Sequence, residues 1–464
     1  MCNVSLNGTQ PTDASIRVLR ALEAAGLEAW YVGGWVRDAL MGRPSHDVDM
    51  CCSGLWQESK EALEAADIAV VESGIKFGGI TAICDDERIE VTTYRLDGFY
   101  TDGRHPQSVE RAASLEDDLA RRDFTVNAMA WHPERGLVDR YDGQGDLDRK
   151  LIRAVGDPKR RFNEDALRML RAVRFACRLD FMIEPKTKQA LAECAPLLDA
   201  VARERVGIEL EGILSTGHGG DAMLRYPELI CAAVPELAAG RGFDQRSVYH
   251  AFNVYEHIAR VLTVAGELAL CDGFTPSMSL MWAAFLHDVS KPDCFTVDHA
   301  GSGHFYGHPE LGAKKARAIM DRLALSHDLV RDVCLLIKYH DKPLRPERSC
   351  LLYMMRLLSG EGVDTPRLMD ELMDLKRADT LGKAPSCFYY VETIEEMRSL
   401  AHDLLEAGEP YSLKMLAING GDLIRAGVKP GPELGQLLNA ALEAVIEDNI
   451  PNDRETLLVH LNLN

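Results

Sequence analysis

Two aspartates near the start of the chain have the spacing of a metal-binding pair. Asp47 and Asp49 lie two residues apart in a segment whose apolar residues predict a strand, so both carboxylates project from one face. Paired carboxylates in this arrangement hold Mg²⁺ against a triphosphate. Glu90, in the alternating segment 88–94, is a candidate third carboxylate, and an exposed strand glutamate is an equally good interpretation of it.

Two glycines precede these aspartates. Gly33 and Gly34 follow the apolar segment 28–32 and lead into a helical pattern, so backbone N–H groups at the helix N-terminus are left open to a phosphate. A Gly-Gly pair alone carries little information, and so does a lone Asp-x-Asp. The glycines, Arg37 and both aspartates nevertheless lie within 17 residues, and together they predict a site for a nucleoside triphosphate and its metal.

Basic residues are concentrated in one segment of an acidic chain. The sequence carries 52 Lys and Arg residues against 72 Asp and Glu residues, and the net charge of −20 argues against non-specific nucleic-acid binding. Residues 159–178, however, contain seven basic residues and only two acidic ones. A solvated helix face is the simpler interpretation of such a run, but its contrast with the rest of the chain favours a phosphate-binding stripe. The arginines that recur there at helical spacing are Arg168, Arg171, Arg174 and Arg178.

The same segment contains a pair of residues that matches two of the four nucleobases. Asp165 and Arg168 are three residues apart, so on a helix they are neighbours and present an acceptor beside donors. Cytosine and adenine offer an amine donor beside a ring-nitrogen acceptor, whereas guanine and uracil offer a carbonyl beside an N–H. The pair therefore predicts selection of C and A. An intrahelical salt bridge, the simpler interpretation, is compatible with this role because it would pre-orient both side chains.

A second group of residues that could bind a metal lies in the later half of the chain. Histidine and carboxylate side chains on separate, converging helices are how a helical bundle builds a divalent metal site. Three further residues, His250, His304 and Asp341, lie close enough in the sequence to leave the ligand set open. The candidates, in or beside segments with helical periodicity, are His257, His287, Asp288, His308, His340 and Asp379.

The elements that must position these residues change in type near residue 150. Before it, helices alternate with short strand-like segments at 28–32, 47–52, 68–71, 79–83 and 88–94. After residue 164 the pattern is almost wholly helical. This change predicts an α+β head followed by a long helical body. The turns that interrupt the helices predict four domains, a head at 1–154, a helical neck at 155–240, a helical domain at 243–385 and a helical tail at 386–464.

Composition and length set further limits. The chain has 464 residues, of which 46% are hydrophobic and 27% charged, as in an ordinary soluble globular protein of several domains. No segment approaches the roughly 18 consecutive apolar residues of a membrane span, and residues 1–11 lack the pattern of a signal peptide, so neither membrane insertion nor export is expected. Twelve cysteines without a Cys-x-x-Cys motif fit a reducing cytoplasm.

Several motifs of the first half resemble those of class II tRNA nucleotidyltransferases and bacterial poly(A) polymerases. They cover roughly residues 28–215 and are specific as a set. The run that contains the glycines and aspartates resembles the first motif of this family, and RRDFTVNAM at 121–129 resembles the second. Further segments resemble the linking motif behind the head, the nucleotide-selecting helix and the last neck motif, at 139–147, 161–175 and 204–210.

This resemblance implies a fold and a reaction. The fold is a polymerase-β-like nucleotidyltransferase head, a mixed sheet with helices, followed by an all-α neck. The reaction is template-independent addition of C-C-A to the 3′ end of tRNA from CTP and ATP, with Mg²⁺ ions at Asp47 and Asp49 in a two-metal mechanism. The resemblance also implies nucleotide-binding roles for Gly33, Gly34, Arg37, Arg122, Asp123, Asn127, Asp165, Arg168, Arg171 and Arg174.

Alternatives within the same family remain open at this point. A poly(A) polymerase, or an A-adding enzyme, is the nearest rival because its head carries the same motifs. Residues 97–106 resemble the flexible loop that the switch from C to A requires, which argues against an enzyme that adds only C. The helical domain and the tail favour the tRNA enzyme.

The helical domain resembles the HD phosphohydrolase superfamily. The segment FLHDVSKP at 285–292 resembles its signature, with His257 as the preceding histidine and Asp379 as the closing aspartate. His308 and His340 match the extra histidines of two-metal members. The resemblance covers about residues 245–385 and implies a divalent transition metal, Mn²⁺ or Ni²⁺, and hydrolysis of a phosphoester such as a cyclic phosphate that blocks a tRNA 3′ end.

Two other interpretations of this domain are kept. It could be an inert relic that helps to grip tRNA, because nucleotide addition does not need it. In a different class of function, the whole protein could be an HD phosphohydrolase with a degenerate head, which the intact acids of the head disfavour. Residues 418–435 resemble the C-terminal segment of longer bacterial members of the nucleotidyltransferase family, whose Gly-rich turn with Lys429 could meet a tRNA backbone or simply join two helices.

Overall fold

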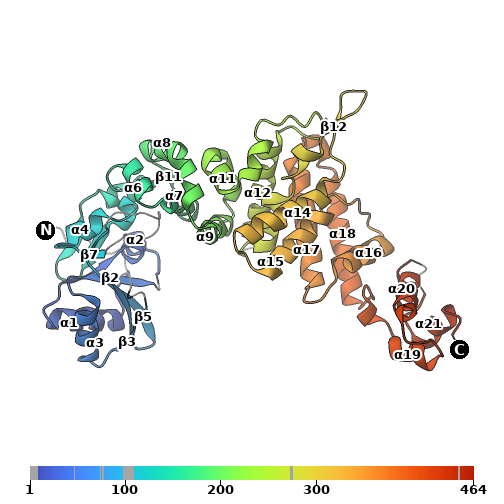
Figure 1. The fold of residues 1–464 in the computed structure, drawn as a ribbon, viewed down its shortest axis with the longest axis horizontal. Helices are drawn as coiled ribbons and strands as arrows, with labels where there is room; N and C mark the ends of the chain where they lie inside the picture. Colours follow the sequence, from blue (N-terminus) through green and yellow to red (C-terminus); the bar gives the residue numbers. More distant parts are fainter. Residues whose placement is uncertain are drawn as a thin grey trace. The chain divides into compact units, whose positions relative to one another are not determined.

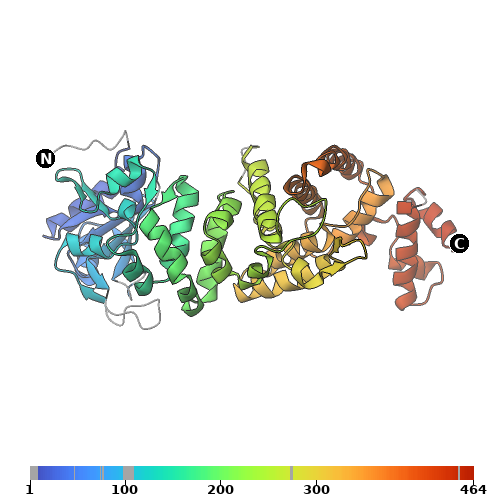
Figure 2. The same ribbon diagram turned by 90° about the horizontal axis from the view of Figure 1, so that it is seen from above.

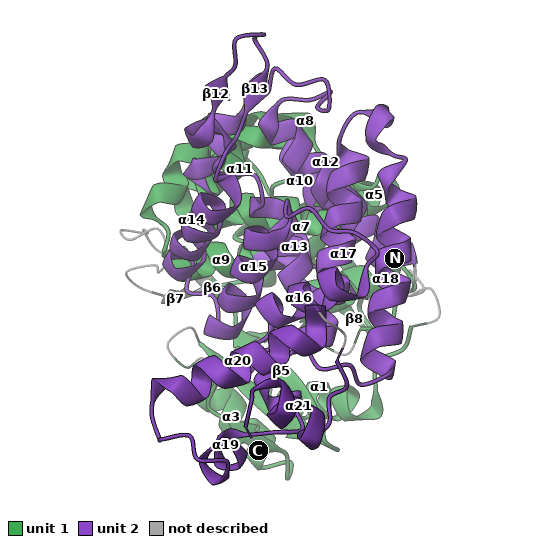
Figure 3. Ribbon diagram, turned by 90° about the vertical axis from the view of Figure 1, so that its right-hand side faces the viewer, with its two compact units in different colours: residues 1–210, 226–233 green, residues 211–225, 234–464 purple. Residues whose placement is uncertain are grey.

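The structure is a computed structural model that describes residues 9–45, 47–73, 75, 78–97, 109–271, 275–447 and 450–463. The chain divides into two compact units, which Figure 3 colours separately. Unit 1 comprises residues 1–210 and 226–233, and unit 2 comprises residues 211–225 and 234–464. The division falls inside the predicted neck, 155–240, so the four domains expected from the sequence remain a prediction.

A mixed sheet of seven strands forms the centre of unit 1. Its order is β3-β4-β5-β2-β1-β8-β9, in which β2 and β5 are parallel and the other neighbouring pairs are antiparallel. The five strands predicted between residues 28 and 94 are all present, with ends that differ by no more than one residue. The bounds are β1 (Ala29–Val32), β2 (Val48–Cys52), β3 (Ala69–Val71), β4 (Gly79–Cys84), β5 (Glu87–Thr93), β8 (Met129–His132) and β9 (Gly136–Asp139).

Three helices cover one face of this sheet (Figure 1). Val18 of α1, Trp35 of α2 and Leu63 of α3 are buried in one apolar core with Met50 of β2 and Ile89 of β5. This pattern follows from the sequence, because apolar residues at helical spacing meet apolar residues at alternate strand positions. The helices are α1 (Asp13–Ala24), α2 (Gly34–Leu40) and α3 (Trp56–Glu64).

The opposite face of the sheet carries a smaller apolar cluster and the start of the helical region. Leu115 and Leu119 of α4 pack there on Trp30 and Cys51 of the sheet. The remaining helices of unit 1, apart from short 3₁₀ turns, are α4 (Leu115–Ala120), α5 (Gly143–Asp148), α6 (Pro158–Glu164), α7 (Leu167–Leu179), α8 (Pro185–Cys194), α9 (Arg203–Leu214) and α11 (Pro227–Ala233). Two further pairs of short strands are β6 (Arg95–Asp97) with β7 (Val109–Arg111), and β10 (Leu151–Ile152) with β11 (Met182–Ile183). The last turn of α9 belongs to unit 2.

Unit 2 is helical, as predicted, and is organised around α13. Every residue of α13 from Ser279 to Leu286 is buried, and α12, α15 and α17 all pack against this helix. Helices α14 and α15 pack side by side (Figures 1 and 2). The bounds are α10 (Gly219–Arg225), α12 (Val254–Cys271), α13 (Met278–Leu286), α14 (His308–Arg322), α15 (His327–Tyr339), α16 (Arg348–Leu358), α17 (Thr365–Gly382), α18 (Tyr390–Glu406), α19 (Gly420–Arg425), α20 (Pro432–Glu447), α21 (Arg454–His460) and the short hairpin β12 (Thr296–Val297) with β13 (Gly303–His304).

The predicted α+β class, a mixed sheet followed by helices, is confirmed. Among the described residues, none of the helices has both the length and the apolar composition needed to cross a bilayer.

Candidate functional site

The central strands of unit 1 bring two of the predicted carboxylates side by side. Asp49 in β2 and Glu90 in the parallel strand β5 are register partners, so their side chains project from the same face of the sheet. Val48 and Met50 face the other way, into the core below the helices. Asp47 directly precedes β2 and is exposed, whereas Asp49 is half-buried. The structure therefore gathers the three candidate carboxylates at one edge of the core.

The charge environment of Asp49 favours a bound cation. Burial raises the pKa of the Asp49 carboxyl to about 6, and the negative charges of Glu90 and Asp47 act in the same direction. Arg122 and Arg37 oppose this shift. Because a divalent ion would relieve the repulsion among three carboxylates, the group fits a divalent metal site.

Gly33 approaches this group so closely that a Cβ atom there would already touch it. Its φ angle of 70° lies in the left-handed region, and α2 begins at the next residue. A Cβ atom at Gly33 would lie 3.1 Å from Nη1 of Arg122 and 3.5 Å from Oδ2 of Asp49. The turn at Gly33 and Gly34, the guanidinium of Arg122 and the carboxylate of Asp49 therefore meet at one point.

Arg37 has protein partners at every nitrogen of its guanidinium. Nε and Nη2 donate to the carboxylate of Asp38, and Nη1 donates to Oδ1 of Asn127 at 2.7 Å. Asn127 in turn donates to Oδ1 of Asp123 at 3.3 Å. In the structure Arg37 thus joins α2 to the RRDFTVNAM segment, and its contact with a nucleotide remains a prediction.

Acidic residues lie against the arginines of α7. Nε and Nη2 of Arg171 donate to Oδ2 of Asp123 at 3.0 and 2.8 Å. Nε of Arg174 lies 3.0 Å from Oε2 of Glu209 in α9. The guanidinium carbons of both arginines lie 5.4 Å from the centre of the Phe175 ring. The predicted stripe is therefore not simply a solvated face, because its arginines are held by acids of neighbouring segments.

Glu209 was not a candidate from the sequence. It is buried in α9, and burial raises the pKa of its carboxyl while Arg174 and Arg171 oppose the shift. A sequence signal existed, because Glu209 lies within the segment 204–210 and is one of its few acids. What the sequence could not supply is its partner, which lies in another helix.

The predicted nucleotide-selecting helix is in fact two helices. Helix α6 ends at Glu164, α7 begins at Leu167, and Asp165 between them has extended backbone with φ −146° and ψ 105°. The expectation that Asp165 and Arg168 are neighbours on one continuous helix is wrong. The physical reason is a local competition, because Oδ1 of Asp165 accepts a hydrogen bond from the backbone N–H of Leu167 and so starts a new helix.

Each member of this pair has a partner that fixes its direction. Nη1 of Arg168 donates to Oε2 of Glu164 at 2.9 Å, and Nη2 donates to the carbonyl oxygen of Arg121 at 3.1 Å. Oδ2 of Asp165 accepts from Nη2 of Arg205 at 3.3 Å. Glu164 therefore pre-orients Arg168, and Arg205 pre-orients Asp165.

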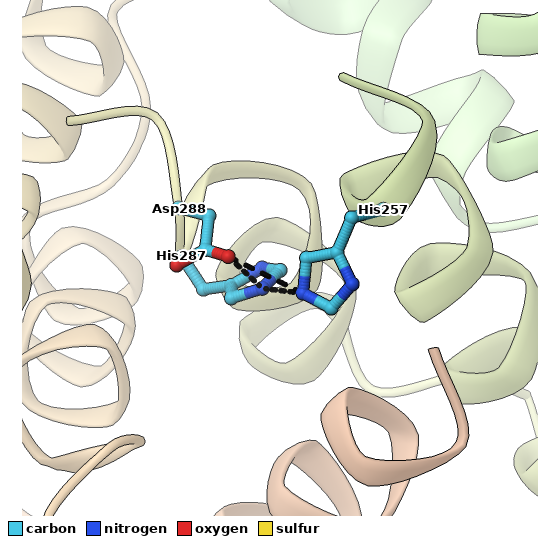
Figure 4. A group of neighbouring side chains, drawn as sticks. All are labelled: His257, His287 and Asp288. Carbon is cyan, nitrogen blue, oxygen red and sulfur yellow. Dashed lines mark hydrogen bonds and ion pairs between the residues drawn. The ribbon is translucent and has the colours of Figure 1, made fainter. Parts of the chain in front are cut away.

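The second group of candidates converges in unit 2. Figure 4 shows His257, His287 and Asp288 with their side chains pointing toward one another. His257 lies in α12, and His287 and Asp288 directly follow α13. Of the other three candidates, His308 lies at the start of α14, His340 at the end of α15 and Asp379 in the last turns of α17.

Asp288 is at the centre of four histidines. Its Oδ2 atom lies 3.2 Å from Nε2 of His257 and 3.3 Å from Nε2 of His287. Its Oδ1 atom lies 3.4 Å from Nε2 of His308 and 3.7 Å from Nε2 of His340. Ligand atoms about 2.1 Å from one metal ion lie about 3–3.5 Å from one another. Each oxygen of Asp288 lies at about this distance from the Nε2 atoms of two histidines, so each oxygen and its two histidines could hold one metal ion.

The peptide backbone orients all four histidines in the same sense. An imidazole whose Nδ1–H donates to a carbonyl leaves the lone pair of Nε2 free for a metal. We assign this tautomer to each of them. Nδ1 lies at hydrogen-bond distance from a carbonyl oxygen in every case, His257 with Gly382 (3.1 Å), His287 with Ala284 (2.9 Å), His308 with Phe305 (2.8 Å) and His340 with Ile337 (2.7 Å).

Buried polar atoms at this centre fit a metal ion. Oδ1 of Asp288 and Nε2 of His308 are buried and lack a hydrogen-bond partner among the residues that the structure describes, whereas Oδ2 of Asp288 forms an ion pair with Nζ of Lys291 at 2.7 Å. Burial acts to raise the pKa of the Asp288 carboxyl, but His287 and Lys291 hold it well below its usual value. An ionised carboxylate surrounded by imidazole nitrogens is a donor set for a divalent transition metal.

A cavity of about 310 Å³ opens onto the histidine cluster. His308, His340, Asp288 and Asp379 line it on the side of the cluster, together with Lys291 and Lys383. The three residues that left the ligand set open, His250, His304 and Asp341, also line this cavity and do not belong to the two metal-sized groups. Burial, with the charge of Lys291, lowers the pKa of His250 to about 2, so this imidazole is neutral at physiological pH.

Most of the predicted flexible loop lies outside the described residues. Of residues 97–106, only Asp97, the last residue of β6, belongs to the described part of the chain. Its role in the switch from C to A remains a prediction.

Family models match four segments of the chain. They are the poly A polymerase head domain at 29–153, the RNA- and SrmB-binding site of polymerase A at 180–239, the HD domain at 254–383 and the tRNA nucleotidyltransferase domain 2 at 387–461.

Relatives and solved structures agree with these matches. The chain is 33% identical to a CCA-adding enzyme of Streptococcus thermophilus, over 96% of this chain and 95% of that relative. It is 32% identical to a CCA-adding enzyme of Limosilactobacillus fermentum, over 95% of this chain and 94% of that relative. Its fold matches the Bacillus stearothermophilus CCA-adding enzyme in complex with CTP, with a TM-score of 0.71 and 25% identity over 98% and 97% of the two chains. It also matches the Thermotoga maritima CCA-adding enzyme complexed with tRNA, with a TM-score of 0.62 and 20% identity over 98% and 96%. The chain, which carries a poly A polymerase head domain and an HD domain, belongs to the family of CCA-adding enzymes, which are nucleotidyltransferases.

Proposed function

We propose that this protein adds C-C-A to the 3′ end of tRNA from CTP and ATP, without a nucleic-acid template, at the site around Asp49. The observation that carries the proposal is the meeting of three carboxylates, the Gly33 turn and Arg122 at one point of the sheet. In this reaction the 3′ oxygen of the tRNA bonds to the α-phosphorus, the bond from that phosphorus to the bridging oxygen breaks, and pyrophosphate leaves. The family to which the chain belongs disfavours both poly(A) polymerase and a degenerate head.

The carboxylates have a defined task in this proposal. Asp47 and Asp49 would hold divalent ions, Mg²⁺ in particular because it prefers oxygen ligands and triphosphates, and Glu90 is available as a third ligand. Such ions, when bound, lower the pKa of the attacking hydroxyl and stabilise the negative charge of the transferring phosphoryl group. The open backbone at Gly33 leaves room for the triphosphate beside Arg122, whose charge favours the same anion.

The remaining candidates would bind and select the nucleotide. Arg122, Asp123 and Asn127 would hold the ribose and the triphosphate, and Asp165 with Arg168 would read the base. Arg171 and Arg174 would add positive charge near the incoming substrate. The donor and acceptor of the selecting pair are held by separate partners, Glu164 and Arg205, which supports a fixed pattern that suits C and A.

A direct assay tests this function. The protein is incubated with tRNA that lacks its 3′ terminal C-C-A and with each labelled nucleoside triphosphate in turn. We expect incorporation of C, and of A only after C, with none from GTP or UTP. Asp49→Ala should abolish addition of C and A alike, and Asp148→Ala, which changes an exposed carboxylate of the same unit, is the control. Near-normal addition by Asp49→Ala would overturn the assignment.

A second activity is favoured by the histidine cluster and its cavity. We propose that the HD domain binds a divalent transition metal, Mn²⁺ or Ni²⁺, and hydrolyses a phosphoester, such as a cyclic phosphate at a tRNA 3′ end. His257, His287, Asp288 and Asp379 would hold one ion, and His308 and His340 would complete a second site. Metal ions there would activate water and polarise the phosphoryl oxygen. A polymerase that needs a free 3′ hydroxyl gives such hydrolysis a purpose.

Phosphodiesterase and phosphatase assays with Mn²⁺, Ni²⁺ and Mg²⁺ test this second activity. We expect hydrolysis by the wild-type protein and none by Asp288→Ala, with C-C-A addition intact in both. Hydrolysis that does not depend on Asp288, or no hydrolysis with any of the three metals, would leave the domain as a scaffold that grips tRNA.

A cytoplasmic location completes the proposal. It is supported by the cysteines, because every cysteine in the described part of the chain is free.

A further inference from the structure

The two histidines nearest Oδ1 of Asp288 lie at the ends of helices. His308 is the first residue of α14, and His340 directly follows α15, after which residues 341–347 form neither helix nor strand. His257, by contrast, lies one turn inside α12, and its backbone N–H donates to the carbonyl oxygen of Asn253 at 2.9 Å. Helix ends fray more readily than helix interiors. The backbone at His308 and at His340 therefore needs support from outside its own helix.

A buried lysine of α17 supports the backbone at His340. Nζ of Lys376 donates to the carbonyl oxygens of His340 and Lys342, at 2.7 and 2.8 Å. The last carbonyls of an α-helix have no partner within the helix, and a lysine side chain can bind them. Because Lys376 is only 6% exposed, water has little access to replace it. Lys376 thus ties the end of α15 to α17.

A buried serine supports the other histidine in the same way. Oγ of Ser290 donates to the carbonyl oxygen of His308 at 2.7 Å, and the side chain is fully buried. Ser290 lies two residues after Asp288, so one short segment supplies both the carboxylate and this support. The rings of His308 and His340 are neighbours, with 5.3 Å between their centroids. Each of these histidines is therefore held twice, by its Nδ1 atom and by its backbone carbonyl.

We propose that Lys376 and Ser290 are the positioning residues of the second metal site, which comprises Oδ1 of Asp288, His308 and His340. The inference rests on the metal-dependent activity proposed for the HD domain, and it adds two residues that orient ligands without binding the ion themselves. Groups of this kind typically contribute 10- to 100-fold to metal affinity. The second ion should therefore depend on two side chains that belong to neither group of ligands.

The other two histidines are oriented by different contacts. Nδ1 of His257 lies 3.1 Å from the carbonyl oxygen of Gly382, and Nδ1 of His287 lies 2.9 Å from that of Ala284. Neither contact involves Lys376 or Ser290. Loss of either positioning residue should therefore lower the affinity for one ion and leave the affinity for the other unchanged.

A titration of the full-length protein with Ni²⁺ measures this effect. Bound metal is removed with a chelator, excess Mg²⁺ is added to occupy sites made of oxygen ligands, and Ni²⁺, which suits imidazole ligands, is titrated by calorimetry. The wild type should bind two Ni²⁺ ions per chain. Lys376→Met and Ser290→Ala should each bind one ion like the wild type and the other 10- to 100-fold more weakly. Ser290→Ala removes a single oxygen atom, so it decides the question if Lys376→Met does not fold.

The matched control is another buried serine of the same domain. Ser279 in α13 is 5% exposed, and its Oγ donates to Oε2 of Glu371 at 2.6 Å. Ser279→Ala therefore also removes a buried hydrogen bond, and it should bind both ions like the wild type. A merely structural role would lower the melting temperature of every variant without changing either Ni²⁺ affinity. Wild-type affinity for both ions in Ser290→Ala, an equal loss of both ions, or the same selective loss in Ser279→Ala would overturn the proposal.

Hydrolysis of bis(p-nitrophenyl) phosphate, a simple phosphodiester, separates this inference from the activity on which it rests. If the variants weaken one ion selectively but the wild type hydrolyses nothing, the hydrolase is wrong and the positioning roles stand. If the wild type hydrolyses the diester but the variants bind both ions as it does, the positioning roles are wrong and the hydrolase stands. A wild type that binds fewer than two ions would remove the second site, and with it the roles of Lys376 and Ser290.

Discussion

Arg122 is fixed in the head by a carboxylate with no exposed surface, that of Asp118. Nε and Nη2 of Arg122 donate to Oδ2 of Asp118 at 3.3 and 3.0 Å, while Arg121 binds the other oxygen at 2.6 and 2.9 Å. The remaining nitrogen of Arg122 lies beside Gly33 and Asp49. Asp118 is therefore a positioning residue, because it holds a cation next to the carboxylates proposed to bind the metal.

Removal of the charge on Asp118 should affect both stability and nucleotide binding. In Asp118→Asn two arginines lose their buried counter-charge, and breaking such a buried pair costs about 3 kcal/mol. For a unit of this size that corresponds to a melting temperature about 6–12 °C lower. We also expect KM to rise for CTP and ATP alike, because Arg122 is no longer held. Asp199→Asn is the control, since the pair of Asp199 with Arg203 is exposed and contributes about 0–1 kcal/mol.

The pKa of Asp118 gives this effect a pH dependence. Burial acts to raise the pKa of this carboxyl, but Arg122 and Arg121 hold it below its usual value. Because the folded-state pKa is lower than that of the unfolded chain, the ion pairs stabilise the protein above about pH 4, and this stabilisation is lost as the pH falls through the folded-state pKa. The difference in melting temperature between the wild type and Asp118→Asn should therefore shrink toward pH 3. A difference that stays constant from pH 7 to pH 3 would contradict the assignment.

Asp49 should titrate in the opposite sense, with consequences for activity. Its pKa is raised to about 6, so the folded state binds this proton more tightly than the unfolded chain does. The proton therefore stabilises the fold fully below about pH 4, and this contribution to the free energy of unfolding is lost as the pH rises through 6. A carboxyl must be ionised to bind a metal, so at subsaturating Mg²⁺ the kcat/KM for CTP should fall below about pH 6. Glu90→Gln removes a negative neighbour and should move this acid limb to lower pH.

The control for this profile is another acid of the same sheet. Asp86 is exposed in the turn between β4 and β5 with a φ of 64°, a conformation that asparagine tolerates, so Asp86→Asn should leave the profile unchanged. An acid limb that is identical in the wild type and Glu90→Gln would show that Glu90 does not influence Asp49.

Local patterns predicted most of the elements and the positions of the candidate residues, but not the contacts between segments. The alternation of apolar residues was enough to predict the strands that hold Asp49 and Glu90. Their pairing depends on the register of two strands separated by about forty residues, which no local pattern contains. The break at Asp165 was missed because a side-chain hydrogen bond, rather than helix propensity, determines the backbone there.

Asp118 illustrates a signal that was present in the sequence but was not used. It lies three and four residues before Arg121 and Arg122, the spacing at which side chains of one helical turn meet. Burial decides its importance, and burial follows from packing of α4 on the sheet. All residues of the histidine cluster were candidates from the sequence, because each lies in or beside a helical segment and a helical bundle brings such positions together; that they bind a metal remains a prediction.

Reversal of the selecting pair should change the choice of base. In Asp165→Arg with Arg168→Asp the donor and the acceptor exchange places, so C and A should be used about tenfold or more less well while the relative use of U or G rises. The measurement is incorporation of each labelled nucleotide by single-turnover assay. Glu164→Gln is the control, because it loosens Arg168 without changing the pattern and should lower activity with the base preference intact. A double variant that loses activity but keeps its preference for C and A would make the pair structural.

The position of Asp288 between two pairs of histidines predicts how many metal ions the HD domain holds. Each oxygen of Asp288 faces one pair, so the wild type should retain two transition-metal ions per chain after dialysis, measured by mass spectrometry. His308→Ala removes a ligand of one site and should retain one ion, whereas Asp288→Ala removes a ligand of both and should retain none. His402→Ala, which changes a half-exposed histidine paired with Asp370, should retain two. Because these variants leave the head untouched, addition of C-C-A should persist in all of them, and full metal content in Asp288→Ala would mean that Asp288 does not bridge the two sites.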